Sequence, residues 1–149
     1  MRIFAAAALT FAASMAPATA QEGPRGFPLD KTYKAISISG FDVQKGALTL
    51  TVVRDGDRLK ASGSAGCNAW TATAIVRDDQ MELAEIVTTR KLCAKPVMKT
   101  EEAFLNTLKT IHGWRVDGNR LILEGEAGRL LLTAAAADTK SAKTPAKKK

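Results

Sequence analysis

Between residues 32 and 133 the sequence is divided into short runs of alternating apolar and polar residues, most of them bounded by residues that favour turns. Asp55-Gly56-Asp57 lies between two such runs and is typical of a β-hairpin turn. The pattern predicts a β-rich domain with mostly antiparallel strands. The predicted strands cover residues 32–39, 47–53, 58–64, 70–76, 80–83, 114–116, 120–123 and 129–133.

One stretch departs from the strand pattern. Apolar residues between Val97 and Ile111 recur roughly at helical spacing, which predicts an amphipathic helix at about 96–111. Pro96 suits a first helical turn, and Gly113 suits the position after the end. We therefore expect an α+β fold, a small, strongly curled antiparallel sheet or open barrel with one inserted helix. The 149 residues are too few for a multidomain enzyme or a (β/α)8 barrel.

The first twenty residues have the features of a secretory signal peptide. Arg2 precedes an apolar run from Ile3 to Met15, Pro17 interrupts it, and Ala18-Thr19-Ala20 is typical of a cleavage site. A transmembrane anchor is the alternative, but the apolar run is too short to span a bilayer. We expect cleavage after Ala20 and a periplasmic or secreted protein in a compartment that permits disulfides.

The two ends of the remaining chain differ from its middle. We expect a flexible lead-in at 21–30, the folded domain at 31–134 and a disordered Lys-rich tail at 135–149. Removing Arg2 and the five tail lysines from the 22 basic residues leaves 16, against 14 acidic residues once Asp138 is removed. The folded part is therefore nearly neutral, which argues against specific nucleic-acid binding. The tail either stays solvated or contacts anionic polymers or lipids of the envelope.

Cys67 and Cys93 are the two cysteines of the chain. A secreted protein with two cysteines most simply forms one disulfide, here joining the strand region near Gly66-Cys67-Asn68 to the segment just before the helix. Reactive thiols are an alternative, because Cys93 precedes a helix start, although His112 lies at the far end of that helix. A metal site is the other alternative, but two cysteines and one histidine are fewer than the four ligands of a structural zinc site.

The run GSAGCNAW, residues 63–70, resembles the G-x-x-G-C-N-x-aromatic signature of the META/HslJ family of small bacterial envelope proteins. Residues 89–93 resemble the family's T-x-x-x-C element, and an acidic helical segment at 101–105 follows, as it does in the family. The resemblance extends from about Tyr33 to Thr133. The positions that match the family motifs are Gly63, Gly66, Cys67, Asn68, Trp70, Thr89 and Cys93.

The resemblance implies a curled antiparallel sheet with a packed helix, and a non-enzymatic role in the envelope or in stress. It offers no known catalytic residues to carry over, and we expect no cofactor and no metal. Many relatives are lipoproteins, whereas the predicted signal segment of this chain lacks a lipidation cysteine, so we expect that it is not a lipoprotein. The Lys-rich tail is also outside the family pattern.

Six positions have both a structural and a functional interpretation. Asn68 could bond the local backbone or act as an oxyanion donor, and His112 could cap the helix or take part in catalysis. Glu101-Glu102 lies early in the helix, where negative charge is favourable, and the two side chains point to different sides. Trp70 and Trp114 are core residues or, in an open barrel, the lining of a ligand pocket.

Three functions remain open on the sequence. The first is a non-catalytic envelope protein with a stress or interaction role, which binds a protein partner through the sheet surface or an edge strand. The second is a carrier of a small hydrophobic ligand in a pocket between sheet and helix. The third is an enzyme that uses Cys93 or His112, which the small number of reactive side chains disfavours. We expect a monomer.

Overall fold

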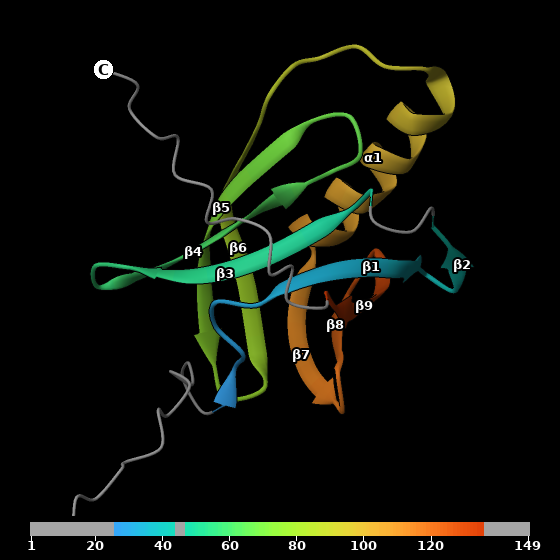
Figure 1. The fold of residues 1–149 in the computed structure, drawn as a ribbon. Helices are drawn as coiled ribbons and strands as arrows, with labels where there is room; N and C mark the ends of the chain where they lie inside the picture. Colours follow the sequence, from blue (N-terminus) through green and yellow to red (C-terminus); the bar gives the residue numbers. More distant parts are fainter. Residues whose placement is uncertain (1–25, 44–46, 136–149) are drawn as a thin grey trace, which may run out of the picture.

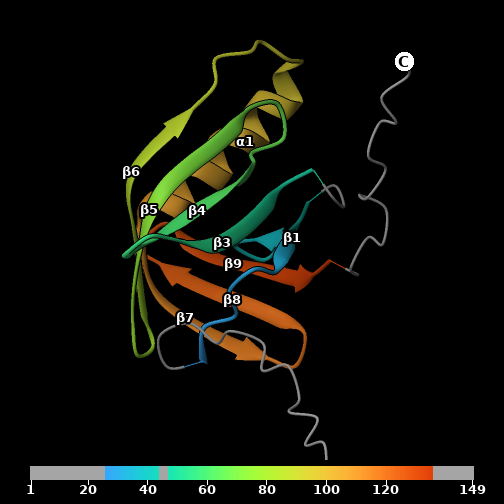
Figure 2. The same cartoon turned by 60° about the vertical axis from the view of Figure 1, so that its left-hand side comes forward.

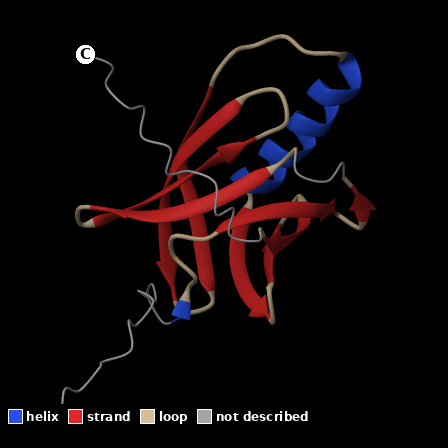
Figure 3. Ribbon diagram, in the orientation of Figure 1, coloured by secondary structure: helices blue, strands red, loops and turns tan. Residues whose placement is uncertain are grey.

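The computed structural model describes residues 26–43 and 47–135 of the chain. The predicted signal peptide at 1–20, residues 21–25 of the lead-in and residues 136–149 of the tail lie outside the described residues. The described chain forms nine strands and one α-helix (Figure 1; Figure 3). The elements are β1 (Thr32–Ile38), β2 (Phe41–Asp42), β3 (Thr49–Asp55), β4 (Arg58–Ser64), β5 (Ala69–Arg77), β6 (Gln80–Thr88), α1 (Lys95–Lys109), β7 (Ile111–Asp117), β8 (Arg120–Gly125) and β9 (Gly128–Ala134).

The strands form one antiparallel sheet in the order β2-β1-β3-β4-β5-β6-β7-β8-β9. Strand β1 also pairs with β9, so that eight strands close into a barrel (Figure 2), and the two-residue β2 extends β1 outside it (Figure 1). The predicted fold, a curled antiparallel sheet or barrel with one helix, is confirmed. Closure through β1 and β9 removes most of the free sheet edges.

The helix packs against the barrel and contacts β6, β1 and β9. It ends at Lys109 rather than at the predicted Ile111, because Ile111 already begins β7 and its side chain is buried in the core. His112 therefore lies on a strand, and the predicted position at a helix end is wrong. None of the helices that the structure describes is long and apolar enough to cross a membrane.

The core lies between the inner face of the barrel and the helix. Trp70 packs edge-on against Phe104 of the helix, with ring centroids 6.1 Å apart. Phe27 and Leu29 are also buried, at 1% and 5% exposure, although the sequence predicts a flexible lead-in at 21–30. The packed part of the chain therefore extends at least to Phe27, since an apolar side chain in the core is ordered by its contacts.

Strand β6 is longer than the predicted 80–83. Its pairing with β5 shifts register between Thr71 and Thr73, and Glu85 on β6 has a positive φ of 55°. This β-bulge interrupts the apolar alternation after Leu83, which explains why the sequence pattern does not predict the second half of the strand.

Candidate functional site

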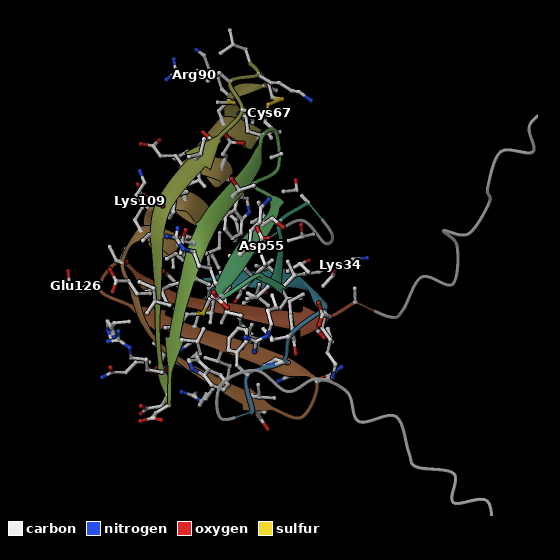
Figure 4. The ribbon with its side chains drawn as sticks, turned by 90° about the vertical axis from the view of Figure 1, so that its left-hand side faces the viewer. Lys34, Asp55, Cys67, Arg90, Lys109 and Glu126 are labelled. Atoms are coloured by element: carbon white, nitrogen blue, oxygen red, sulfur yellow. A yellow bond between two sulfur atoms is a disulfide. The ribbon has the colours of Figure 1, made fainter. Side chains whose placement is uncertain are left out.

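The predicted disulfide between Cys67 and Cys93 is present, with the two Cα atoms 6.0 Å apart. It joins the β4–β5 connection to the loop between β6 and α1. Cys67 and Arg90 lie at the same end of the molecule in Figure 4, well away from Asp55 and Glu126. No cysteine in the described chain is free, so reactive thiols are not available in this oxidised state.

Asn68, the residue after Cys67, is the centre of a buried hydrogen-bond network. Its backbone N–H donates to Oε2 of Glu101 at 2.7 Å, and its side-chain Nδ2 donates to Oε1 of the same carboxylate at 2.7 Å. Glu101 comes from the helix and is only 5% exposed, and Asn68 is 3% exposed. Both carboxylate oxygens therefore have a donor, which buried charge requires.

The other side of the Asn68 amide holds the loop that follows β6. Its Oδ1 accepts hydrogen bonds from the Thr89 hydroxyl at 2.8 Å and from the Lys91 backbone N–H at 2.7 Å. Its Nδ2 also donates to the Lys91 carbonyl at 3.2 Å. One amide thus connects the β4–β5 connection, the helix and the loop, beside the disulfide.

The two motif glycines make room for this arrangement. A Cβ on Gly63 would overlap the backbone carbonyl of Thr49. Gly66 has a φ of 107°, which residues that carry a side chain rarely adopt. The indole Nε1 of Trp70 donates to the same Thr49 carbonyl at 3.2 Å. The described motif residues are therefore positioned for structure: they bring β3, β5, the loop and the helix together.

The sequence did not predict the burial of Glu101. Its position in the sequence does indicate burial. Glu101 lies on the apolar face of the helix with Val97, Phe104 and Leu108, at spacings of three and four residues. A carboxylate on that face needs a buried polar partner, and Asn68 is that partner. Glu102 points away and is exposed, as expected.

Trp70 and Trp114, the predicted pocket residues, lie in different surroundings. Trp70 is 1% exposed and fills the core against Phe104. Trp114 packs edge-on against Phe27, with ring centroids 4.8 Å apart, and its Nε1 has no hydrogen-bond partner among the described residues. The structure thus assigns the two rings to separate aromatic pairs.

His112 lies in a surface hollow of about 630 Å³ at the start of β7. Lys109, Glu82 and Glu126 also line it, and His112 itself is exposed. Asn68, the other proposed catalytic candidate, has both polar atoms of its side chain engaged in the network. Within residues 26–43 and 47–135, no three His, Cys, Asp or Glu side chains gather to hold a metal ion.

A more apolar groove of about 670 Å³ separates the helix from the β1–β2 hairpin. Phe41, which is 79% exposed, forms part of its wall. Across from it the helix contributes Pro96, Ala103 and Thr107. This groove is a place between sheet and helix where an apolar molecule could bind.

The barrel has one weak seam, between β6 and β7. Strand β6 pairs with β5 from Gln80 to Thr88, but among the described residues it pairs with β7 only where Gln80 lies opposite Gly113. The rest of that β6 edge, residues 82–88, has no paired strand in the described chain, although β7 lies near its start and the helix also contacts β6 (Figure 2). Three exposed side chains mark this segment: Glu82, Glu85 and Val87.

Comparisons with known proteins agree with the fold. A family model described as META domain matches residues 28–138. An NMR structure of a protein from Burkholderia xenovorans superposes with a TM-score of 0.59 at 22% identity, covering 85% of this chain and 97% of that one. A second NMR structure superposes with a TM-score of 0.55 at 19% identity, covering 69% of this chain and 87% of the other. No curated protein matches the sequence significantly.

Proposed function

This chain belongs to the META domain family, and from that premise we propose that it is a non-catalytic protein of the cell envelope that binds a protein partner. The binding surface is the free edge of β6, residues 82–88. The role is one of interaction, of the kind that protects or supports envelope proteins under stress. The observation that carries the proposal is the missing strand pairing along this edge.

An unpaired edge offers backbone N–H and C=O groups to an extended segment of another chain. The bulge at Glu85 and the charges of Glu82 and Glu85 limit indiscriminate pairing. A suitable partner segment therefore carries basic side chains opposite these two glutamates, since unlike charges across a strand pair are favourable. Val87, which is 64% exposed, adds an apolar contact.

The envelope location is supported by two independent features. The first twenty residues have the order of a secretory signal peptide, with cleavage after Ala20. The Cys67–Cys93 disulfide fits an oxidising compartment. The non-catalytic assignment is supported by the use of the motif side chains in packing and hydrogen bonds.

The proposal is tested by placing a photo-crosslinking amino acid at Glu82 in cells that produce the protein. Position 60 is the matched control, because Lys60 is also exposed but lies on β4, which pairs on both sides. We expect a discrete protein adduct from position 82 and none from position 60. Equal adducts at both positions, or no adduct at position 82, would contradict binding at the β6 edge.

The groove between the helix and the β1–β2 hairpin favours a second candidate function, transport of a small hydrophobic ligand. Ala103 lines the groove, so Ala103→Trp should fill it, whereas Ala94→Trp places the same ring on the exposed loop outside it. A carrier purified from its own envelope would retain a small molecule in native mass spectrometry. The ligand should disappear in Ala103→Trp and persist in Ala94→Trp.

A further inference from the structure

Leu92 is the most exposed large apolar residue of the described chain, at 94%. It lies in the loop between β6 and α1, which arches beyond the ends of β5 and β6 (Figure 1). Transferring such a side chain from water to an apolar surface is favourable, so a side chain left this exposed is available to a partner.

The loop holds Leu92 in place from both sides. The Lys91 backbone bonds the Asn68 side chain through its N–H at 2.7 Å and its carbonyl at 3.2 Å. Cys93 is fixed by the disulfide to Cys67. A loop ordered in advance loses little conformational entropy when it binds, which favours affinity.

The charged residues of the segment that carries Leu92 have one sign, although the exposed Glu102 of the helix lines a hollow with Lys95 and Lys99. Residues 86–100 contain four cations, Arg90, Lys91, Lys95 and Lys99, and no acidic residue. The neighbouring connection, residues 62–74, has no charged residue, and the buried Glu101 is engaged by Asn68. Arg90 extends from this end in Figure 4, far from the labelled Asp55 and Glu126. We call residues 89–95 the cationic tip.

We propose that the cationic tip binds the surface of an anionic lipid bilayer. Leu92 enters the headgroup region, while Arg90, Lys91 and Lys95 contact lipid phosphates. Cations beside an exposed apolar residue are the combination that attaches proteins to anionic membranes. The convex shape of the loop suits a flat surface. This site is separate from the β6 edge and does not depend on partner binding there.

The position of residue 92 is measured with Leu92→Trp in the oxidised full chain and vesicles that contain brominated phosphatidylglycerol. Bromine quenches an indole that enters the bilayer. Phe41→Trp is the matched control, because Phe41 is also exposed but lies on β2. We expect quenching beyond that of the wild type in Leu92→Trp, and none beyond it in Phe41→Trp.

This design separates the tip from the lysines that follow residue 139. Those lysines are present in every variant, so they affect sedimentation with vesicles equally. If the protein sediments with vesicles but Leu92→Trp is not quenched, the contact is made elsewhere and the proposal is overturned. Equal quenching in both variants would overturn it as well.

The charge requirement is tested with Arg90→Glu/Lys91→Glu, and with Arg58→Glu/Lys60→Glu on β4 as the control of equal charge change. Only the first pair should weaken binding to phosphatidylglycerol vesicles, by about tenfold or more. The unfolding midpoint and the disulfide should be unchanged in both. Equal weakening in the two pairs would show a nonspecific effect of net charge and contradict a specific tip.

Discussion

At the scale of single residues, Asn68 makes more structural contacts than its sequence context predicts. The sequence favours a local hydrogen bond in a turn, but the side chain also reaches the helix and the loop after β6. The spacing of apolar residues predicts which face of a helix is buried. It does not predict which distant polar groups meet, because that depends on how the barrel closes.

Replacing Asn68 with alanine should lower the free energy of unfolding by about 2–4 kcal/mol. The substitution leaves the buried Glu101 carboxylate with one donor fewer and the Lys91 N–H without its acceptor. Urea unfolding followed by circular dichroism measures the change. Asn106→Ala is the control, because Asn106 is an exposed asparagine on α1, the helix that carries Glu101. Removing its side-chain amide should change the free energy of unfolding by less than about 0.5 kcal/mol.

The pKa of Glu124 is held below its ordinary value, first by the hydrogen bond from Arg115 and also by the charges of Arg115 and Arg129. The ionised carboxylate therefore favours the folded state. This contribution is present above the pKa of the unfolded chain and is lost as the pH falls through the lower folded pKa. Arg115→Gln should raise the pKa of Glu124 in a carbon-13 NMR titration, and an unchanged pKa would contradict the assignment.

Gly63 shows a constraint that acts through the backbone. Gly63→Ala should lower the free energy of unfolding by about 1–3 kcal/mol, because its Cβ would overlap the Thr49 carbonyl and push β3 from β4. Thermal unfolding of the oxidised protein measures this. Gly113→Ala is the matched control, since its Cβ would meet Asp79 at an ordinary 3.7 Å; a similar loss in both variants would be inconsistent with the specific overlap.

At the scale of elements, the hydrophobic period predicted the helix and most strands because each element buries one face. The turn sequence Asp55-Gly56-Asp57 predicted the hairpin that β3 and β4 form. The second half of β6 and the start of β7 were missed for a physical reason. The bulge at Glu85 breaks the alternation, and Ile111 continues the apolar face of the helix while belonging to the next strand.

The disulfide fixes the loop between β6 and α1 to the β4–β5 connection. The cysteines are 26 residues apart, for which loop entropy gives about 3.5 kcal/mol. Cys67→Ser/Cys93→Ser should lose about this much stability in urea unfolding. Adding reductant should bring the wild type to the stability of the variant and leave the variant itself unchanged. A wild type insensitive to reduction would contradict the prediction.

At the scale of the whole molecule, the motif residues hold the barrel, the loop and the helix together, and the two binding surfaces that we propose are the β6 edge and the cationic tip. The motif joins strands, loop and helix, and its Thr89 and Cys93 belong to the exposed cationic tip, whereas the β6 edge at 82–88 contains none of its residues. The sequence suggested an edge strand or sheet surface as the binding site. It could not indicate which edge stays free, because that follows from the pairing of β1 with β9 and the weak seam beside β6.

The most direct test of this account is native mass spectrometry of the protein isolated gently from its own envelope. We predict an oxidised chain that begins at Gln21, carries no small molecule and is bound to a protein partner. Val87→Lys on β6 should lose the partner, and Val116→Lys, at an exposed position on β7, should keep it. A bare monomer, or a stoichiometric apolar molecule in place of a protein, would contradict binding at the β6 edge.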